Sequence, residues 1–233
     1  PSCKFDWFAS ECRYRCHCFN NTCNARGQSA NGECTAASYC DKGWFGPSCQ
    51  YVDLVTTNTT ESTPDWIYDF PDTRCNLGLE TVTVSLNDTF YFTWLRLHIN
   101  SSGFSQDFKL QLMFANGSSV ECGNMYTSKI NDTILDIHCQ PGAFFQQINI
   151  TGAGVKYLCS VYISGGRNVA LGQETAQISN YKNTDSTYAV DGDTNPDFAG
   201  ESCTHTNGDQ NPYWNLTFAL AHQVQRYVIY NRN

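Results

Sequence analysis

Residues 81–86, with the sequence TVTVSL, and residues 90–99, with the sequence FYFTWLRLHI, decide the fold class of this 233-residue chain. In these stretches apolar side chains recur at every second position, which places them on one face of an extended strand. β-Branched and aromatic residues dominate both stretches, as they do in strands generally. Similar runs follow at residues 108–114, 133–137, 147–150 and 156–163.

Turn-forming residues separate these runs, and no segment has a convincing amphipathic helical pattern. The turn signals are Asn87-Asp88, Ser102-Gly103, Asn116-Gly117 and residues 152–154. Several short strands at this spacing predict an all-β sandwich or barrel over residues 51–166. Residues 167–233 offer two further strand candidates, 214–218 and 226–230. These are too few to close a second sandwich, so we expect this segment to be the N-terminal part of a domain.

Thirteen cysteines fall into two populations. Eight lie within the first 49 residues, a density typical of a disulfide framework in an exported protein. The other five are spread over the rest of the chain, where we expect them to staple domains that have their own core, and one must remain unpaired. The dense group is Cys3, Cys12, Cys16, Cys18, Cys23, Cys34, Cys40 and Cys49; the sparse group is Cys75, Cys122, Cys139, Cys159 and Cys203.

Eight sequons for N-glycosylation also indicate an exported chain. Each is expected to mark a solvent-facing position, because a glycan cannot be buried. The chain is therefore expected to be secreted, or to be the extracellular part of a cell-surface protein. The sequons begin at Asn20, Asn58, Asn87, Asn100, Asn116, Asn131, Asn149 and Asn215.

The charge distribution excludes one class of partner. The formal net charge is −8, and the 14 lysines and arginines form no run or stripe. Nucleic-acid binding therefore has no electrostatic basis. No stretch approaches 18 consecutive apolar residues, so we expect no membrane segment in this chain.

The cysteine-rich head contains a short repeat, in which Cys3 to Cys12 matches Cys40 to Cys49 in spacing and in an aromatic pair. The second copy, C-x-x-G-W-F-G-x-x-C, resembles the closing loop of an EGF-like module of the multiple-EGF or laminin type. This resemblance implies the pairs Cys16–Cys23, Cys18–Cys34 and Cys40–Cys49 in a module over residues 16–50. Cys3–Cys12 would belong to the tail of a preceding repeat, residues 1–15. Zinc at Cys16-His17-Cys18 is a poor alternative, because adjacent ligands do not suit a tetrahedral site.

A second resemblance lies in residues 167–233. The segments NVAL (168–171), AVDGDTNPDF (189–198), SCTHT (202–206), NPYW (211–214) and YNR (230–232) are similar to the start of an F-type lectin (fucolectin) domain. That family has a discoidin-like jelly roll, which implies tandem β-sandwich domains behind the head. Residues 51–166 would then be a divergent copy, with Cys75–Cys159 and Cys122–Cys139 as its bridges and Leu77 in place of the sugar-binding histidine.

The lectin resemblance implies a fucose site at His205 and Arg232, which stand 27 residues apart as in the family. The residues support this chemistry, since an imidazole and a guanidinium can bracket sugar hydroxyls and Phe198 can supply an apolar wall. The family's calcium site would fall on Asp191, Asp193 and Ser202, oxygen donors that suit a hard cation. The plain alternative for the Asp-Gly-Asp loop is a turn without metal. In the family the partner of Cys203 lies near the end of the domain, past residue 233.

Two functions follow as hypotheses. The first is an extracellular glycan-recognition or adhesion protein that binds fucosylated glycans through residues 167–233. The second is a structural or self-associating interaction protein whose lectin-like domains bind other extracellular proteins or copies of this chain. We do not expect an enzyme, because the five histidines show no metal-ligand spacing and no G-x-S-x-G motif occurs.

Overall fold

A computed structural model describes residues 3, 7–8, 12, 14–21, 23, 32–35, 39–68, 74–76, 78–100, 107–139, 141–198 and 202–232. The chain divides into two compact units. The sandwich unit comprises residues 16–23 and 33–167, and the terminal unit comprises residues 1–15, 24–32 and 168–233. Leu77, the residue expected to replace the sugar-binding histidine in the first domain, lies outside the described residues.

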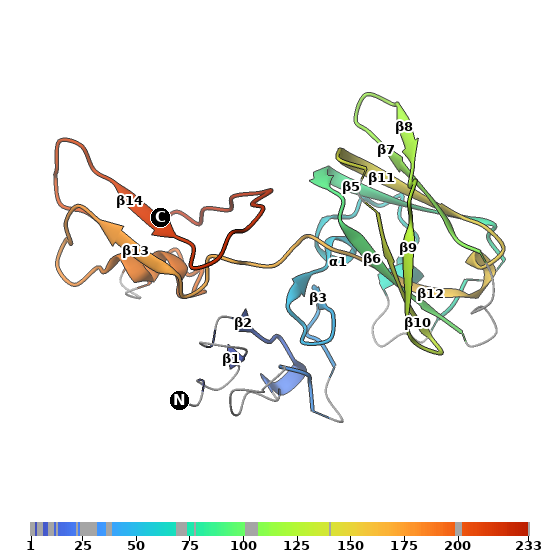
Figure 1. The fold of residues 1–233 in the computed structure, drawn as a ribbon, viewed down its shortest axis with the longest axis horizontal. Helices are drawn as coiled ribbons and strands as arrows, with labels where there is room; N and C mark the ends of the chain where they lie inside the picture. The colour runs from blue at the N-terminus through green and yellow to red at the C-terminus, as the bar shows by residue number, and fades with distance from the viewer. Residues whose placement is uncertain are drawn as a thin grey trace. The chain divides into compact units, whose positions relative to one another are not determined.

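Two four-stranded antiparallel sheets build the sandwich unit, which confirms the all-β fold class (Figure 1). The first sheet has the order β12-β6-β10-β9 and the second the order β5-β11-β7-β8. The strands of the first are β12 (Leu158–Ile163), β6 (Trp94–Ile99), β10 (Ile134–His138) and β9 (Tyr126–Asn131). Those of the second are β5 (Thr81–Tyr91), β11 (Phe144–Thr151), β7 (Lys109–Met113) and β8 (Ser119–Glu121).

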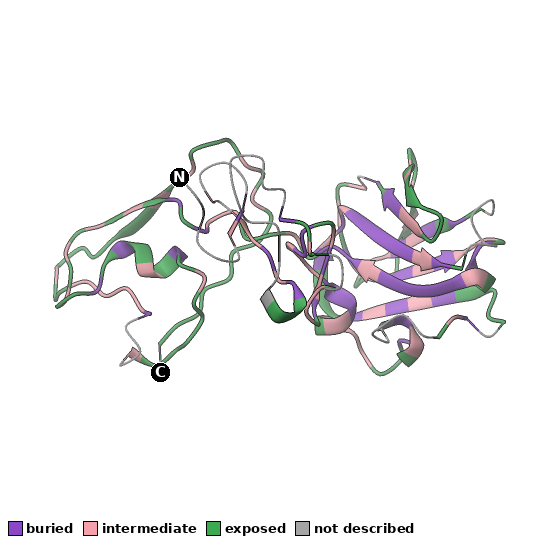
Figure 2. Ribbon diagram, turned by 90° about the horizontal axis from the view of Figure 1, so that it is seen from below, coloured by how far each residue is buried: buried purple, intermediate pink, exposed green. Residues whose placement is uncertain are grey.

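The alternation that predicts these strands also predicts their buried face. Val82, Val84 and Leu86 of β5 lie in the same core cluster as Leu95 and Leu97 of β6. All five are essentially inaccessible to solvent, and Figure 2 shows that buried residues are concentrated on the strands of the sandwich. Because this core contains residues of both sheets, the two sheets form a sandwich.

Two details of the expected strands are wrong. Asn87-Asp88 is not a turn but lies within β5, where Phe145 pairs with Phe90 and Gln147 with Ser85. The residues of β5 between Ser85 and Phe90 form a bulge in the ladder, so the polar residues Asn87 and Asp88 remain in the strand and face solvent. The run 90–99 is not one strand, because β5 ends at Tyr91 and β6 begins at Trp94 in the other sheet.

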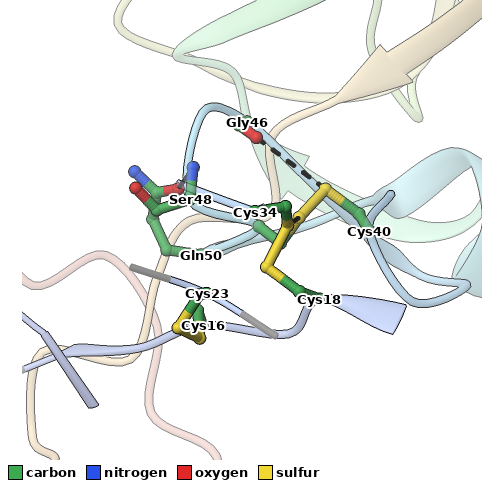
Figure 3. The surroundings of a disulfide bond; sticks show 9 residues. Cys16, Cys18, Cys23, Cys34, Cys40, Gly46, Ser48 and Gln50 are labelled. Carbon is green, nitrogen blue, oxygen red and sulfur yellow. Dashed lines mark hydrogen bonds between the residues drawn. A yellow bond between two sulfur atoms is a disulfide. The ribbon is translucent and has the colours of Figure 1, made fainter. Parts of the chain in front are cut away.

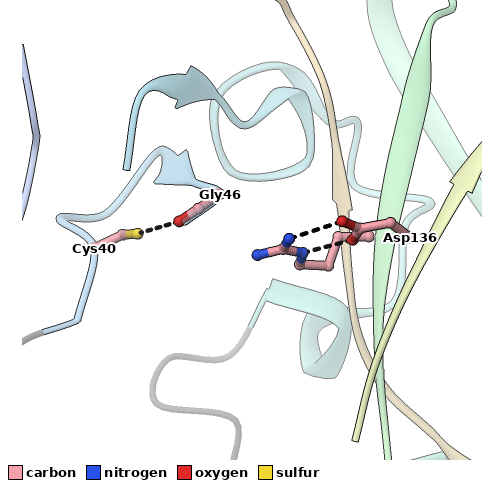
Figure 4. A network of polar contacts seen from close by, with 4 residues as sticks. Cys40, Gly46 and Asp136 are labelled. Atoms are coloured by element: carbon pink, nitrogen blue, oxygen red, sulfur yellow. Dashed lines mark hydrogen bonds and ion pairs between the residues drawn. The ribbon is translucent and has the colours of Figure 1, made fainter. Parts of the chain in front are cut away.

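The outer face of the first sheet carries a buried ion pair. Arg96 and Asp136 are direct partners across β6 and β10, with bonds of 2.6 Å from Nε and 2.8 Å from Nη2 to the carboxylate (Figure 4). Both side chains are less than a tenth exposed. Two parallel bonds of this kind give the geometry that compensates the desolvation of two charges.

A hairpin from the head covers this face. Strands β3 (Trp44–Phe45) and β4 (Tyr51–Val52) pair antiparallel. The buried ring of Phe45 lies 4.8 Å from Trp94 and 5.5 Å from Tyr162, and Tyr51 meets Trp94 edge-on at 5.0 Å. Phe45 therefore packs on the first sheet of the sandwich, whereas Trp44 stacks on His17 within the head.

A one-turn helix continues from this hairpin. Helix α1 (Leu54–Asn58) begins at Asp53, whose carboxylate accepts hydrogen bonds from the backbone N–H groups of Val55 and Thr56. Asp53 also accepts the N–H of Ile163 at the end of β12. Burial raises the pKa of Asp53 to about 6, against the effect of these hydrogen bonds. One buried carboxyl group thus joins the helix to the sheet. The described residues of the sandwich unit also include the 3-10 turns η2 (Phe19–Asn21), η3 (Asp65–Tyr68) and η5 (Val155–Tyr157).

Six disulfides have the pairing that the two family resemblances imply: Cys3–Cys12, Cys16–Cys23, Cys18–Cys34, Cys40–Cys49, Cys75–Cys159 and Cys122–Cys139. The bridge Cys122–Cys139 does not tie two neighbouring strands of one sheet. Cys122 follows β8 of one sheet and Cys139 follows β10 of the other, so the bond links the two layers.

The terminal unit has little regular structure among its described residues. Strands β1 (Trp7–Phe8) and β2 (Tyr14–Arg15) form one short hairpin. Strands β13 (Glu174–Gln177) and β14 (Trp214–Thr217) form a second sheet, and η6 (Ser186–Val190) is a 3-10 helix. The expected strand at 226–230 is not formed, because no described segment pairs with it. No helix among the described residues is long and apolar enough to cross a membrane.

Candidate functional site

The main chain of His205 is held by three donors. Its carbonyl accepts hydrogen bonds from the N–H of Tyr181 at 2.9 Å, from Thr184 Oγ1 at 2.8 Å and from Gln177 Nε2 at 3.4 Å. Gln177 is the last residue of β13, so the histidine is tied to the sheet formed by β13 and β14. These bonds fix the backbone of His205 and leave both ring nitrogens to other contacts.

The structure brings the three predicted sugar-site residues together. The ring of Phe198 meets that of His205 edge-on, with centroids 5.6 Å apart. Arg232 lies over Phe198, with its Cζ 5.0 Å from the ring centroid, and its Nη1 is 3.5 Å from His205 Nδ1. Arg232 is exposed and the two rings are half-buried, so the cluster is open to solvent.

A fourth residue of this cluster was not predicted. The ring of Tyr181 lies 4.6 Å from that of His205 and 6.4 Å from that of Phe198. Lys182, which has a left-handed backbone (φ 53°), places its Nζ 5.3 Å from the Tyr181 centroid. Neither residue belongs to a repeating pattern or to the quoted motifs, so no sequence signal identified them. We call Tyr181, Phe198, His205 and Arg232 the aromatic–cation cluster.

The contact between Arg232 and His205 favours one tautomer of the neutral imidazole. A guanidinium has only donors and cannot lose its proton in a protein. The 3.5 Å approach of Nη1 to Nδ1 is therefore favourable only when Nδ1 is an unprotonated acceptor. In that form Nε2 carries the remaining proton and is a donor. The cluster then offers hydrogen-bond donors from two side chains beside two aromatic faces.

The predicted calcium residues lie in a loop of successive Asx turns. Asp191 accepts the N–H of Asp193, Asp193 accepts that of Asn195, and Asn195 accepts that of Asp197, at 2.8 to 3.0 Å. Ser202 Oγ, which is buried, donates to the carbonyl of Asn195 at 2.9 Å. Partial burial raises the pKa of Asp191, and the charge of Asp193 adds to this effect.

These residues fit calcium in kind. They supply carboxylate, hydroxyl and carbonyl oxygens, which are the ligands of a hard cation. A cation would also relieve the repulsion between the two carboxylates. Within the described part of the chain, no third acidic side chain joins them in a group that could hold a metal.

The zinc alternative for the head is wrong. Cys16, Cys18 and Cys23 do lie close together, with ligand atoms within 4.8 Å of one another. All three sulfurs are in disulfides, however, and zinc binds the thiolate.

The free cysteine and the sequons are placed as follows. Cys203 is half-buried and unpaired. No sequon asparagine is buried: Asn20, Asn87, Asn100, Asn116, Asn131 and Asn215 are exposed, and Asn58 and Asn149 are intermediate.

Comparison with known proteins gives structural neighbours but no family. No family model matches the chain, and no curated protein matches it. One similar structure is a family 32 carbohydrate-binding module from Streptococcus pneumoniae EndoD, at TM-score 0.35 and 13% identity, covering 49% of this chain and 99% of that one. Another is the family 32 module from Clostridium perfringens NanJ in complex with galactose, at TM-score 0.32 and 14% identity, covering 46% and 88%.

An F-lectin (fucolectin) from striped bass (Morone saxatilis) serum is also similar, at TM-score 0.28 and 20% identity, covering 58% of this chain and 51% of that one. These overall similarities are low. The description of the sandwich therefore rests on its own strand order and core, and the candidate site on its own side chains.

Proposed function

We propose that this chain is part of an extracellular glycan-recognition protein and that the aromatic–cation cluster binds a fucose-type sugar. The observation that carries the proposal is the convergence of Tyr181, Phe198, His205 and Arg232 from four separate segments into one solvent-open cluster. Only the lectin motif predicts that residues 27 positions apart should meet beside an aromatic ring.

The chemistry of the cluster suits a sugar with both a polar and an apolar side. Arg232 and the Nε2–H of His205 can donate to vicinal hydroxyls or to the ring oxygen. The faces of Phe198 and Tyr181 can receive the methyl group or C–H face of the sugar. A carbonyl held by three hydrogen bonds keeps His205 in place before the ligand arrives, which reduces the cost of ordering on binding.

A glycan array tests this function directly. The full chain should bind fucose-terminated glycans, and His205→Ala should abolish binding because it removes the central donor. His222→Ala is the matched control, since the ring of His222 packs on Phe218, with centroids 5.3 Å apart, and Phe218 is not a member of the cluster. Loss of binding in both variants, or retention in His205→Ala, would contradict the proposal.

A calcium ion at Asp191, Asp193 and Ser202 belongs to the same proposal. Bound calcium would hold the loop that precedes the Cys-Thr-His motif. Calorimetric titration with calcium alone should give a binding isotherm that is weakened at least tenfold in Asp191→Asn and unchanged in Asp132→Asn, whose carboxylate pairs with Lys129 in the sandwich unit. Equal isotherms for the wild type and Asp191→Asn would contradict the proposed calcium site.

A second function has one specific observation in its favour. Residues 227–230 expose large apolar side chains, with Tyr227 82% and Ile229 87% accessible. Such a surface suits self-association or binding to another extracellular protein. If this is the function, sedimentation velocity should show concentration-dependent oligomers that disappear in Ile229→Lys, while glycan arrays remain blank.

A further inference from the structure

Two disulfides of the head lie in direct contact. Sγ of Cys34, which is bonded to Cys18, is 3.1 Å from Sγ of Cys49, which is bonded to Cys40 (Figure 3). The sulfurs of Cys18, Cys34 and Cys49 all lie within 4.8 Å of one another. A thiolate released at Cys34 would therefore lie next to the Cys40–Cys49 bond, and a thiolate released at Cys49 would lie next to the Cys18–Cys34 bond.

The two remaining cysteines, Cys18 and Cys40, are also placed to form a disulfide with each other. Cys18 and Cys40 form an isolated antiparallel bridge. It is flanked by the bonds Phe19 N–H to Tyr39 O at 2.6 Å and Asp41 N–H to His17 O at 2.7 Å. Cys18 and Cys40 thus form a non-hydrogen-bonded pair, for which the Cα–Cα distance is about 4.5 Å. That separation is within the range that a disulfide can span.

We propose that the head has a second disulfide arrangement, Cys18–Cys40 with Cys34–Cys49, reached by thiol-catalysed exchange. Both arrangements contain two bonds among the same four cysteines. The change is an isomerisation with no net oxidation or reduction, and its catalyst is a small-molecule or protein thiol from outside the chain.

Three exchange steps balance the reaction. The external thiolate attacks Sγ of Cys40, which is half-buried, forms a mixed disulfide and releases the Cys49 thiolate. Cys49 attacks Sγ of Cys34, forms Cys34–Cys49 and releases the Cys18 thiolate. Cys18 attacks Sγ of Cys40 in the mixed disulfide, forms Cys18–Cys40 and regenerates the external thiolate. Cys18 and Cys49 are almost fully buried, whereas Cys40 and Cys34 are both half-buried, so the external thiolate can enter at Cys40 or, by the symmetric sequence of steps, at Cys34.

The exchange would change the packing between the hairpin and the sheet. In the described arrangement the bond Cys40–Cys49 closes the loop that carries Phe45, the residue seated on Trp94 and Tyr162. The second arrangement opens that loop, since Cys40 and Cys49 then have different partners. The isomerisation would thus loosen the hairpin from the outer face of the first sheet.

Disulfide mapping tests the proposal. The full chain carrying Cys203→Ser, which removes its unpaired thiol, is incubated with a glutathione redox buffer, quenched with acid, alkylated and digested without reduction. Chymotrypsin at Tyr39 and trypsin at Lys42 separate Cys34, Cys40 and Cys49. Mass spectrometry should then detect a fragment that joins Cys34 to Cys49 and one that joins Cys18 to Cys40, with the other four bridges retained.

A single substitution isolates the key step. In Cys18→Ser, the Cys34 thiol should displace Cys40 from Cys49, so the Cys34–Cys49 fragment forms and Cys40 is alkylated. The matched control Cys139→Ser frees Cys122 in the sandwich, where alkylation of Cys122 and an unchanged head are expected. Detection of only the Cys18–Cys34 and Cys40–Cys49 fragments in the parent chain, together with an alkylated Cys34 in Cys18→Ser, overturns the proposal.

Discussion

At the scale of single residues, a few hydrogen-bonded polar groups fix the positions of neighbouring elements that apolar packing alone would not fix. Asp53 caps a helix and bonds to a strand, and the carbonyl of His205 accepts three donors. Such groups are satisfied and buried or half-buried, so removing a partner leaves an unpaired polar atom and destabilises the fold. Each therefore determines the position of a neighbouring element.

Asp53 gives a pH-dependent stability that can be measured. Its pKa is about 6 in the folded chain and about 3.8 when unfolded, so between pH 4 and pH 6 the unfolded state loses a proton that the folded state keeps. The stability associated with Asp53 is therefore full below pH 4 and is lost as the pH rises through 6, by about 3 kcal/mol. The neutral side chain in Asp53→Asn would carry no such penalty.

The measurement compares chemical denaturation of the wild type and Asp53→Asn across this range. The free energy of unfolding of the variant, relative to that of the wild type, should increase from pH 4 to pH 7. The comparison cancels the opposite contributions of exposed carboxyl groups such as Asp132 and Asp185, whose pKa values are lowered by hydrogen bonds. A difference that stays constant with pH would contradict the account.

At the scale of elements, the hairpin β3–β4 is the piece that connects a disulfide-rich module to a conventional core. No described residue of the head belongs to the hydrophobic core cluster, and modules of this size depend on their disulfide bridges. Phe45 adds burial by packing on Trp94 and Tyr162 of the first sheet. The hairpin thus extends the sandwich rather than standing apart from it.

Phe45→Ala tests this packing. The ring is only 3% exposed, so its removal should lower the free energy of unfolding of the sandwich unit by about 3–5 kcal/mol. Tyr126→Ala is the control, because Tyr126 is 66% exposed and its loss should cost much less. Equal losses in the two variants, followed by thermal or denaturant unfolding, would show that the hairpin adds no stability through Phe45.

How far the sequence reveals these elements depends on the type of signal. Strand β7 was identified because its apolar residues alternate over a buried face, whereas β9 was missed because Tyr126–Asn131 is largely exposed at a sheet edge. The cysteine pairs and the meeting of His205 with Arg232 were anticipated through family resemblance. Tyr181 could not be anticipated, because its role depends on a turn and a tertiary contact that leave no periodic pattern.

At the scale of the whole molecule, the proposed function requires an exported chain with accessible glycosylation sites and a site open to sugar. Six disulfides and eight sequons occur in one acidic chain. None of the sequon asparagines is buried, as attachment of a glycan requires. The hydrophobic core cluster lies in the sandwich unit, and the candidate site lies in the terminal unit.

Glycosylation can be checked on the chain expressed in a eukaryotic secretory host. Digestion with peptide N-glycosidase should lower the mass and convert occupied asparagines to aspartates. Occupancy should be highest at exposed positions such as Asn116 and Asn131 and lower at Asn149, which accepts and donates side-chain hydrogen bonds with Thr83, Gln147 and Gln111. An unchanged mass after digestion would contradict the prediction that the chain carries N-glycans.

A nitrogen-15 NMR titration of the histidine side chains with L-fucose tests sugar binding by the aromatic–cation cluster at the residue that would donate to the ligand. We expect the neutral ring of His205 to carry its proton on Nε2, and its resonances to shift on saturation with the sugar while those of His222 do not. In Arg232→Ala the His205 shift should be reduced at the same sugar concentration, because the second donor is lost. Unperturbed His205 resonances at saturating fucose would contradict the assignment of the aromatic–cation cluster as a sugar-binding site.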